Sequence, residues 1–343
     1  MTGILRVCVV LCWSTVVASV IGCVVPDPGP GDTLPGTPPT LAPPITFNYR
    51  NPGNPISDPS QFPDAELVDV YLPAPTGSRL GMLLWVHGGG WVGGTRADVP
   101  AWVLQQVPRG YVVASIGYRL VTYDAGGVVH NAFPAAVEDI KVAIRFLRNL
   151  GAFLGASPHL TLAGASAGGH LAAFVGATPG QFEDGDPAFR AEVSAVVDIV
   201  GPTDLRALAT PVDPPNIAAQ LVAFYVASLL GCPQPTIAAP YTCPPGTDFE
   251  RASVIPQIDV SDPPMYFGYG GADVLIPAAQ GAAAAAGLYQ VTGEKLMSWY
   301  DLAETAGHGL DGTALHMTAL QGFIDAARDG RFDELRTTLP HGG

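Results

Sequence analysis

The sequence has 343 residues, of which 48% are hydrophobic and 13% are charged, so the chain is long enough to bury one sizeable core. Its 30 acidic residues outnumber its 16 Lys and Arg residues, which gives a formal net charge of −14 at pH 7. Because this charge repels the phosphates of a nucleic acid and no basic stripe offsets it, the composition excludes a nucleic-acid-binding protein.

Residues 1–22 predict export from the cytosol. Arg6 precedes an apolar run that ends at Gly22, which is typical of a signal peptide and short for a membrane span. The residues up to Cys23 are typical of a bacterial lipobox, in which cleavage exposes the cysteine for lipidation; the alternative is an ordinary signal peptide with an incidental cysteine. Residues 23–45, rich in Pro, Gly and Thr, are expected to form an extended tether. We therefore expect a cell-envelope lipoprotein that meets the membrane only through its lipid anchor, or otherwise a secreted protein.

Strands alternate with helices through residues 46–335, which we predict to be one domain, followed by a tail at 336–343. Apolar runs predict strands at residues 66–72, 80–86, 111–116, 160–163, 193–200, 265–269 and 295–300. Apolar residues at helical spacing predict a helix over 134–150. This alternation indicates a mainly parallel sheet flanked by helices on both faces, with reactive side chains at the carboxyl ends of the strands.

A loop of consecutive glycines, His87-Gly88-Gly89-Gly90-Trp91, follows the second of these strands. Glycines let backbone N–H groups face a cavity without obstruction by Cβ atoms, which is how an oxyanion hole is built. We predict that the amides of Gly89 and Gly90 serve this purpose, and that His87, Gly88 and Trp91 support the loop. The alternative is a merely flexible glycine loop.

Gly164-Ala165-Ser166-Ala167-Gly168 matches the G-x-S-x-G nucleophile elbow, between a predicted strand and a predicted helix. The outer glycines keep bulk away from a strained turn, so that the Ser166 hydroxyl projects above the sheet. We predict that Ser166 is the nucleophile and that the Ala167 amide completes the oxyanion hole. Small residues around a serine are also common in any chain rich in Gly and Ala.

An acid and a histidine are expected on loops after later strands, in that order. Asp273 follows the predicted strand at 265–269 and is our candidate acid, while His308 lies between two glycines after the last strand and is our candidate base. Asp204, after the strand at 193–200, is the rival acid. His170 is a weak rival base, because it lies one helical turn beyond Ser166 and is expected to pack beneath the elbow.

Residues 203–262 do not fit the regular alternation and predict a small cap insertion after the sixth strand of the fold. Asn216 is expected to cap a helix that runs to Leu230, which is either docked on the sheet or a lid over the site. Trp91 and Tyr123 are candidates to line the pocket, although aromatic residues more often belong to a core.

Five cysteines occur in the chain, and two of them lie within the predicted signal peptide. With Cys23 lipidated, Cys232 and Cys243 remain as a pair that a disulfide could join in an oxidising compartment. No other cysteine or clustered histidine flanks this pair, so we predict no metal site.

Together these motifs resemble the α/β-hydrolase esterases close to hormone-sensitive lipase and to the bacterial feruloyl-esterase-like branch. The resemblance spans roughly residues 65–330, and the segments that carry it are 87–91, 117–120, 133–135, 138–140, 164–171, 273–277 and 307–309. It implies an α/β-hydrolase fold in which Arg119 and Asp139 are structural.

The same resemblance implies a serine carboxylesterase that hydrolyses small acyl or aryl esters through an acyl-enzyme, with no cofactor or metal. An arylformamidase is the alternative enzyme, because that group shares a His-Gly-Gly-x-Trp element and a Ser-Ala-Gly elbow. A hydrolase-fold binding module without activity is the alternative from a different class, although such modules typically lose the nucleophile or the histidine.

Overall fold

The computed structural model describes residues 40–74, 80–183, 191–209, 217–233, 243–293, 298–309 and 316–332. The predicted signal peptide, Cys23, most of the tether, the helix cap Asn216 and the predicted tail at 336–343 lie outside these residues. Within the described part of the chain, no helix has both the length and the apolar character that a membrane span requires.

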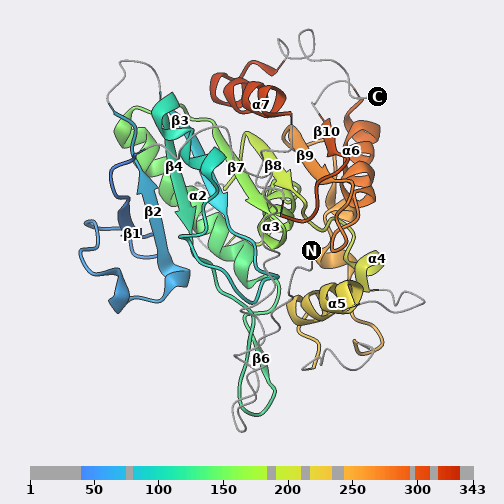
Figure 1. The fold of residues 1–343 in the computed structure, drawn as a ribbon. Coiled ribbons are helices and arrows are strands. Elements are labelled where there is room, and N and C mark those ends of the chain that lie inside the picture. Colours follow the sequence, from blue (N-terminus) through green and yellow to red (C-terminus); the bar gives the residue numbers. More distant parts are fainter. Residues whose placement is uncertain are drawn as a thin grey trace, which may run out of the picture. The chain divides into compact units, whose positions relative to one another are not determined.

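A large sheet forms the centre of the domain (Figure 1), in the order β1-β2-β4-β3-β7-β8-β9-β10. Its strands are β1 (Ile45–Asn48), β2 (Leu67–Tyr71), β3 (Gly81–Val86), β4 (Tyr111–Ile116), β7 (Leu160–Ala165), β8 (Ala195–Ile199), β9 (Met265–Gly270) and β10 (Ser298–Ala303). β4, β3, β7, β8, β9 and β10 run parallel to their neighbours in this order, except that β4 pairs antiparallel with β2. β2 in turn pairs antiparallel with β1 at one edge of the sheet. The predicted α/β architecture with a mainly parallel sheet is therefore confirmed.

β1 is a strand that the sequence analysis did not predict, and it begins at the last residue of the expected tether. Its four residues pair with β2, with Ile45 opposite Val70 and Asn48 opposite Leu67. Two further short strands, β5 (Thr122–Tyr123) and β6 (Val129–His130), form a separate antiparallel ribbon.

Helices fill the connections between the parallel strands. They are α1 (Ala101–Leu104), α2 (Ala135–Leu154), α3 (Ala167–Gly176), α4 (Leu205–Ala209), α5 (Ile217–Leu229), α6 (Ala279–Thr292) and α7 (Met317–Asp329). Short 3-10 turns occupy Pro59–Gln61, Asp64–Glu66, Val107–Arg109, Glu250–Ala252 and Ile255–Gln257. The predicted helix at 134–150 corresponds to α2, which runs a further turn and ends at Gly155 in the left-handed conformation.

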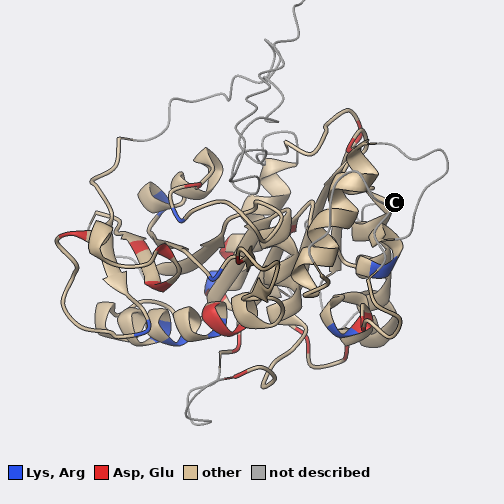
Figure 2. Cartoon of the chain, turned by 90° about the horizontal axis from the view of Figure 1, so that it is seen from below, with Lys and Arg blue, Asp and Glu red and all other residues tan. Residues whose placement is uncertain are grey.

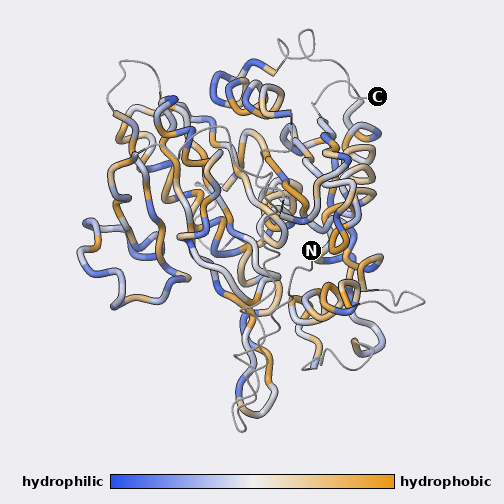
Figure 3. Tube along the Cα trace, viewed as in Figure 1, coloured by the Kyte–Doolittle hydropathy of each residue, from blue (hydrophilic) through white to orange (hydrophobic). Residues whose placement is uncertain are grey.

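The helices cover both faces of the sheet. Alternate residues of a strand point to opposite faces, so the contacts of β9 show which helix lies on which face. In β9, the Tyr266 ring packs against Phe323 of α7 at 5.8 Å, whereas the Tyr269 ring lies against Gly281 of α6. Met265 points to the same face of β9 as Tyr269 and lies against Gly176 of α3, so α3 and α6 share a face. Strand residues between these layers form the hydrophobic core, and many of them are orange in Figure 3.

Charged residues are scattered over the helices and loops, as Figure 2 shows. Both α2 and α7 carry acidic and basic residues together. The resemblance predicted that Arg119 and Asp139 are structural, and the structure pairs the Arg119 Nε with the buried Asp139 carboxylate at 2.9 Å. Asp139 also pairs with Arg50, so this pair ties the start of the domain to α2.

The segment between β8 and β9 contains α4, α5 and two of the 3-10 turns. β8 is the sixth strand of the large sheet in chain order, so the insertion falls where the sequence predicts a cap. In Figure 1, α4 and α5 lie at the lower end of the sheet, the end from which the β5–β6 ribbon projects.

Candidate active site

Ser166 lies in the sharp turn between β7 and α3, with φ 54° and ψ −122°. Positive φ is costly for a residue with a side chain, and surrounding hydrogen bonds hold it here. The Ser166 N–H donates to the Ile199 carbonyl at 2.8 Å, and the Ser166 carbonyl accepts from the His170 N–H at 3.0 Å. The turn is therefore anchored to the neighbouring strand on one side and to α3 on the other.

The two outer glycines of the motif are required by close backbone approach. A Cβ added at Gly164 would lie 2.2 Å from the Gly168 carbonyl oxygen, and one added at Gly168 would lie 2.1 Å from the Val86 carbonyl oxygen. Neither distance is possible for real atoms, and backbone cannot move aside cheaply. This elbow can therefore form only when glycine occupies both outer positions of the G-x-S-x-G pattern.

The predicted acid, base and nucleophile form one chain of hydrogen bonds. The His308 Nε2 lies 2.9 Å from the Ser166 Oγ, and the His308 Nδ1 lies 2.8 Å from the Asp273 Oδ2. With Nδ1–H donating to the carboxylate, Nε2 is left as the acceptor for the serine hydroxyl. This is the arrangement in which a histidine can remove a proton from serine.

Asp273 is held by its own loop. Its Oδ1 accepts from the N–H groups of Leu275 at 2.8 Å and Ile276 at 3.0 Å, which leaves Oδ2 for His308. The Asp273 side chain is fully buried, whereas the His308 side chain is 24% exposed. A buried carboxylate next to a partly exposed imidazole fixes the ring without blocking access to it.

The loops that carry Asp273 and His308 are joined to one another where β9 and β10 end. The Ala272 N–H donates to the Ala306 carbonyl at 2.9 Å, and the Gly271 N–H donates to the Ala303 carbonyl at 2.9 Å. The parallel strands thus deliver the acid and the base to the same edge of the sheet.

The glycine loop after β3 lies directly beside the serine. A Cβ added at Gly88 would lie 3.3 Å from the Ser166 Cβ. Gly89 has φ 111° and Gly90 has φ 59°, both in the left-handed region. Within the described residues, the N–H groups of Gly89, Gly90 and Ala167 donate to no acceptor, so they are free for an oxygen atom of a ligand.

His87 supports this loop from inside the protein. Its ring is buried, stacks on Tyr118 at 4.3 Å and has its Nδ1 2.7 Å from the Gly88 carbonyl oxygen. Burial lowers the pKa of His87. A Cβ at Gly94 would lie 2.3 Å from the same Nδ1, so the ring fills the space beneath the turn.

Trp91 and His170 form a second support beneath the elbow. The Trp91 side chain is 3% exposed, and its Nε1–H donates to the His170 Nδ1 at 3.2 Å. The His170 Nε2–H donates to the Ala252 carbonyl at 2.7 Å, and burial lowers the pKa of His170 to about 4. His170 is therefore a neutral packing residue with both ring nitrogens engaged, and Trp91 belongs to the core.

Asp204, the rival acid, has a different task. Its Oδ1 accepts from the Ala207 N–H at 3.1 Å at the start of α4, and its own N–H donates to the Gln280 side chain at 2.7 Å. The structure pairs His308 with Asp273 and places Asp204 at a helix start.

Asp198 is a buried residue next to the elbow that the sequence analysis did not single out. Its Oδ2 accepts from the Tyr269 hydroxyl at 3.0 Å and its Oδ1 accepts from the Gly201 N–H at 2.8 Å. Burial raises the pKa of Asp198 to about 7. Asp198 precedes Ile199, whose carbonyl holds the Ser166 N–H, so it braces the turn behind the serine. The sequence does carry a signal for Asp198, because it is an acidic residue inside an otherwise apolar strand.

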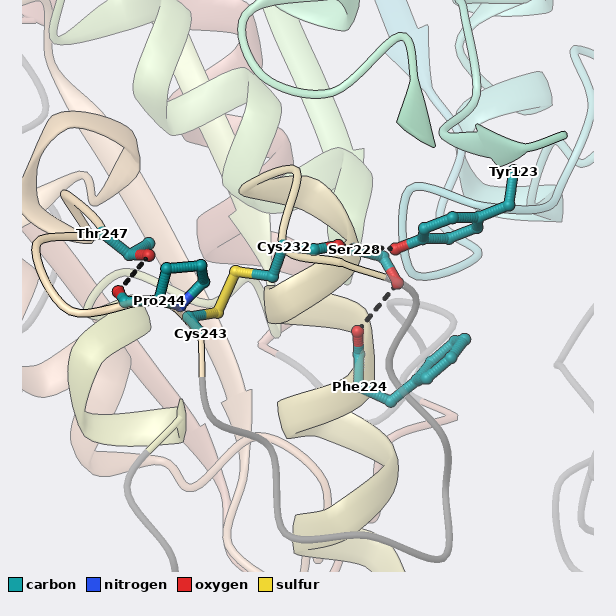
Figure 4. The surroundings of a disulfide bond; sticks show 7 residues. All are labelled: Tyr123, Phe224, Ser228, Cys232, Cys243, Pro244 and Thr247. Carbon is teal, nitrogen blue, oxygen red and sulfur yellow. Dashed lines mark hydrogen bonds between the residues drawn. A yellow bond between two sulfur atoms is a disulfide. The ribbon is translucent and has the colours of Figure 1, made fainter. Parts of the chain in front are cut away.

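The predicted disulfide between Cys232 and Cys243 is present, with a Cα–Cα distance of 5.2 Å (Figure 4). The Tyr123 hydroxyl lies 3.5 Å from the Cys232 carbonyl oxygen. Tyr123 therefore contacts the residues after α5. In the part of the chain that the structure describes, no group of His, Cys, Asp or Glu residues is arranged to hold a metal ion.

A mainly parallel sheet, a serine at a strand–helix elbow and an Asp–His pair on the loops after two later strands define an α/β-hydrolase. The chain belongs to the BD-FAE family, whose model matches residues 68–288. The resemblance to α/β-hydrolase esterases inferred from the motifs is thereby confirmed.

Esterase LipC of Mycobacterium tuberculosis (strain ATCC 25618 / H37Rv) is 31% identical to this chain over 283 residues. That match covers 78% of this chain but only 59% of LipC, so the chain spans less than two thirds of that relative's length.

Solved structures show the same fold. A truncated form of a carbohydrate esterase from gut microbiota aligns with a TM-score of 0.62 at 23% identity, over 84% of this chain and 96% of that chain. Esterase B from Lactobacillus rhamnosis aligns with a TM-score of 0.63 at 18% identity, over 88% of this chain and 90% of that chain.

Proposed function

We propose that this protein is a serine carboxylesterase in which Ser166, His308 and Asp273 act as the catalytic triad. The observation that carries the proposal is the hydrogen-bonded chain from the Asp273 carboxylate through the His308 ring to the Ser166 hydroxyl. Relatives named esterases support the reaction class. The substrates we propose are esters of small acyl or aryl acids.

In the proposed mechanism, the Ser166 Oγ bonds to the ester carbonyl carbon while its proton passes to the His308 Nε2. The carbonyl oxygen becomes an oxyanion and accepts hydrogen bonds from the free N–H groups of Gly89, Gly90 and Ala167. The intermediate collapses to an acyl-enzyme, and the departing alkoxide takes the proton from His308.

Deacylation repeats these steps with water as the nucleophile. His308 removes a proton from the water as its oxygen bonds to the acyl carbon, and the same oxyanion site holds the negative charge. When the acid is released, the proton returns to the Ser166 Oγ. Asp273 keeps the imidazole in the required tautomer and stabilises its charged form throughout.

The test is hydrolysis of p-nitrophenyl esters from acetate to palmitate by the wild-type protein, Ser166→Ala and His308→Ala. We expect kcat to fall by more than about a thousandfold in both variants. Ser261→Ala, which removes an exposed serine in the turn before β9, is the matched control and should retain full activity. Formanilide is assayed beside the esters. Activity that survives in Ser166→Ala would overturn the mechanism, and turnover of formanilide alone would favour an arylformamidase.

We also propose that the protein is exported and anchored through a lipid on Cys23. The disulfide between Cys232 and Cys243 supports an oxidising compartment. Labelled palmitate should enter the wild-type protein in bacterial cells and should be absent from Cys23→Ala, which should move to the soluble fraction. Equal labelling of both proteins would contradict the proposal.

A further inference from the structure

The cap helix α5 reaches the proposed oxyanion loop through one side chain, Tyr225. A Cβ added at Gly90 would lie 2.5 Å from the Tyr225 Cδ1, 2.6 Å from its Cγ and 2.7 Å from its Cε1. All three are atoms of the rigid aromatic ring, so the ring packs directly on the Gly90 backbone. α5 therefore borders the site and does more than dock on the sheet.

The surface that α5 offers is apolar. No residue from Ile217 to Leu229 is charged, and Figure 3 shows this helix as mainly hydrophobic. Burial raises the pKa of Tyr225, so its side chain is neutral. Within the described residues the Tyr225 hydroxyl has no hydrogen-bond partner, so the ring is held by packing. Such a wall suits an uncharged organic group.

The carboxyl end of α5 is fixed to the rest of the domain. The Leu229 carbonyl accepts from the Phe133 N–H at 2.8 Å, and the Cys232 N–H donates to the Ala227 carbonyl at 2.9 Å. Cys232 is in turn joined to Cys243, with Tyr123 on its other side (Figure 4). Tyr225 lies one helical turn before Leu229, so these contacts hold its ring in place above Gly90.

We propose that Tyr225 is a specificity-determining residue whose ring limits the length of the acyl chain bound beside the oxyanion loop. The carbonyl oxygen of the substrate must reach the Gly90 amide, so a group bonded to the same carbon lies beside the adjacent ring, and we assign that group to the acyl chain. A fixed aromatic wall at this point favours short acyl groups. This inference rests on the proposed function, because it assigns the Gly90 amide to an ester oxyanion.

The experiment compares kcat/KM for p-nitrophenyl acetate, hexanoate and decanoate in the wild type, Tyr225→Ala, Tyr225→Leu and Tyr225→Phe. We expect the ratio of decanoate to acetate to rise by about tenfold or more in the Ala variant and to stay unchanged in the Phe variant. Tyr289→Ala, which removes an α6 tyrosine that is 56% exposed, is the matched control and should keep the wild-type ratio. A loss of fold alone would lower all rates together, whereas the inference requires the ratio to change. If the Ala variant does not fold, the decanoate-to-acetate ratio of the Leu variant tests the inference instead.

An unchanged ratio in the Ala and Leu variants would overturn the inference while leaving the Ser166-dependent esterase intact. A change seen with different alcohols but not with different acyl chains would overturn the assignment to the acyl group. Calorimetric binding of p-nitrophenyl hexanoate to Ser166→Ala and to Ser166→Ala with Tyr225→Ala is independent of turnover. We expect tighter binding, by about tenfold, when the ring is absent. Equal affinity would overturn the inference even if no ester is hydrolysed.

Discussion

Among the described residues, two Asp–His pairs lie in the last third of the chain, and only one of them has a serine within hydrogen-bond distance of its histidine. The His308 Nδ1 lies 2.8 Å from Asp273, and the His316 Nδ1 lies 2.6 Å from Asp301. Both carboxylate side chains are fully buried. The far nitrogen of His308 reaches Ser166, whereas the His316 side chain is 77% exposed and, within the described residues, binds only Asp301. A buried Asp–His pair is therefore not by itself a catalytic site.

The two carboxylates differ in what else they bind. Asp273 accepts two N–H groups from its own loop, so it orients one imidazole and little more. Asp301 also accepts the Tyr266 hydroxyl and the His316 N–H. It thereby joins β9 and β10 to the start of α7. We therefore expect the first pair to serve proton transfer and the second to serve tertiary structure, and this difference is open to measurement.

Replacement of Asp273 by Asn should have the largest effect. An amide can donate to His308 and stabilise the wrong tautomer, so we expect kcat to fall by about a thousandfold to ten-thousandfold. The free energy of unfolding should change little by comparison. Ester hydrolysis and urea denaturation measure the two quantities. If Asp273→Asn kept its activity and Asp301→Asn lost it, the assignment of the two pairs would be reversed.

Asp198 extends the comparison to a buried carboxylate that has a tyrosine partner instead of an imidazole. Burial raises the pKa of Asp198 from 3.8 to about 7. Between roughly pH 4 and pH 7 the folded protein therefore holds a proton that the unfolded chain has released. The contribution of this group to stability is present below the unfolded pKa and is lost as pH rises towards 7, by up to about 1.4 kcal/mol per pH unit.

The corresponding variant is Asp198→Asn, which cannot titrate. Urea denaturation at pH 5, 6 and 7 should show that the stability difference between wild type and variant shifts in favour of the variant as pH rises. Parallel curves for the two proteins would mean that Asp198 is ionised throughout and that its tyrosine partner offsets the burial.

Asp301→Asn should lower stability and leave catalysis intact. The amide loses acceptor capacity while the Tyr266 hydroxyl and the His316 N–H still point at it, so we expect a loss of about 1–3 kcal/mol. The kcat/KM of the folded variant should equal that of the wild type. A large loss of activity at unchanged stability would show that Asp301 acts on the site through β10.

The same residues explain what the sequence could and could not predict. β4 was predicted with its observed bounds, 111–116, because every residue of it except Ser115 is apolar. The predicted strand at 295–300 stops short of the observed end of β10 at Ala303, because Asp301 breaks the apolar run and its partners Tyr266 and His316 are distant in sequence. β1 was missed because four residues beside a proline-rich stretch become a strand only by pairing with β2.

The candidate site was more predictable than the cap. The elbow and the glycine loop have local backbone requirements that only glycine meets, so their sequence pattern is itself evidence. The contact between Tyr225 and Gly90 joins residues that are far apart in the chain, and no periodicity encodes it. Helical spacing predicted that α5 exists, but its distance from the site is a property of tertiary packing.

His316→Ala should have the smallest effect and gives the strictest test of the comparison. Its side chain is 77% exposed, so loss of the contact with Asp301 should cost less than about 1 kcal/mol. The His316 N–H still caps Asp301 from the backbone, because alanine retains that donor. Ester hydrolysis should be unchanged in His316→Ala, whereas it should be nearly abolished in His308→Ala. Both variants remove an imidazole bound to a buried aspartate. Equal losses of activity would therefore show that activity does not depend on the contact between a histidine and Ser166.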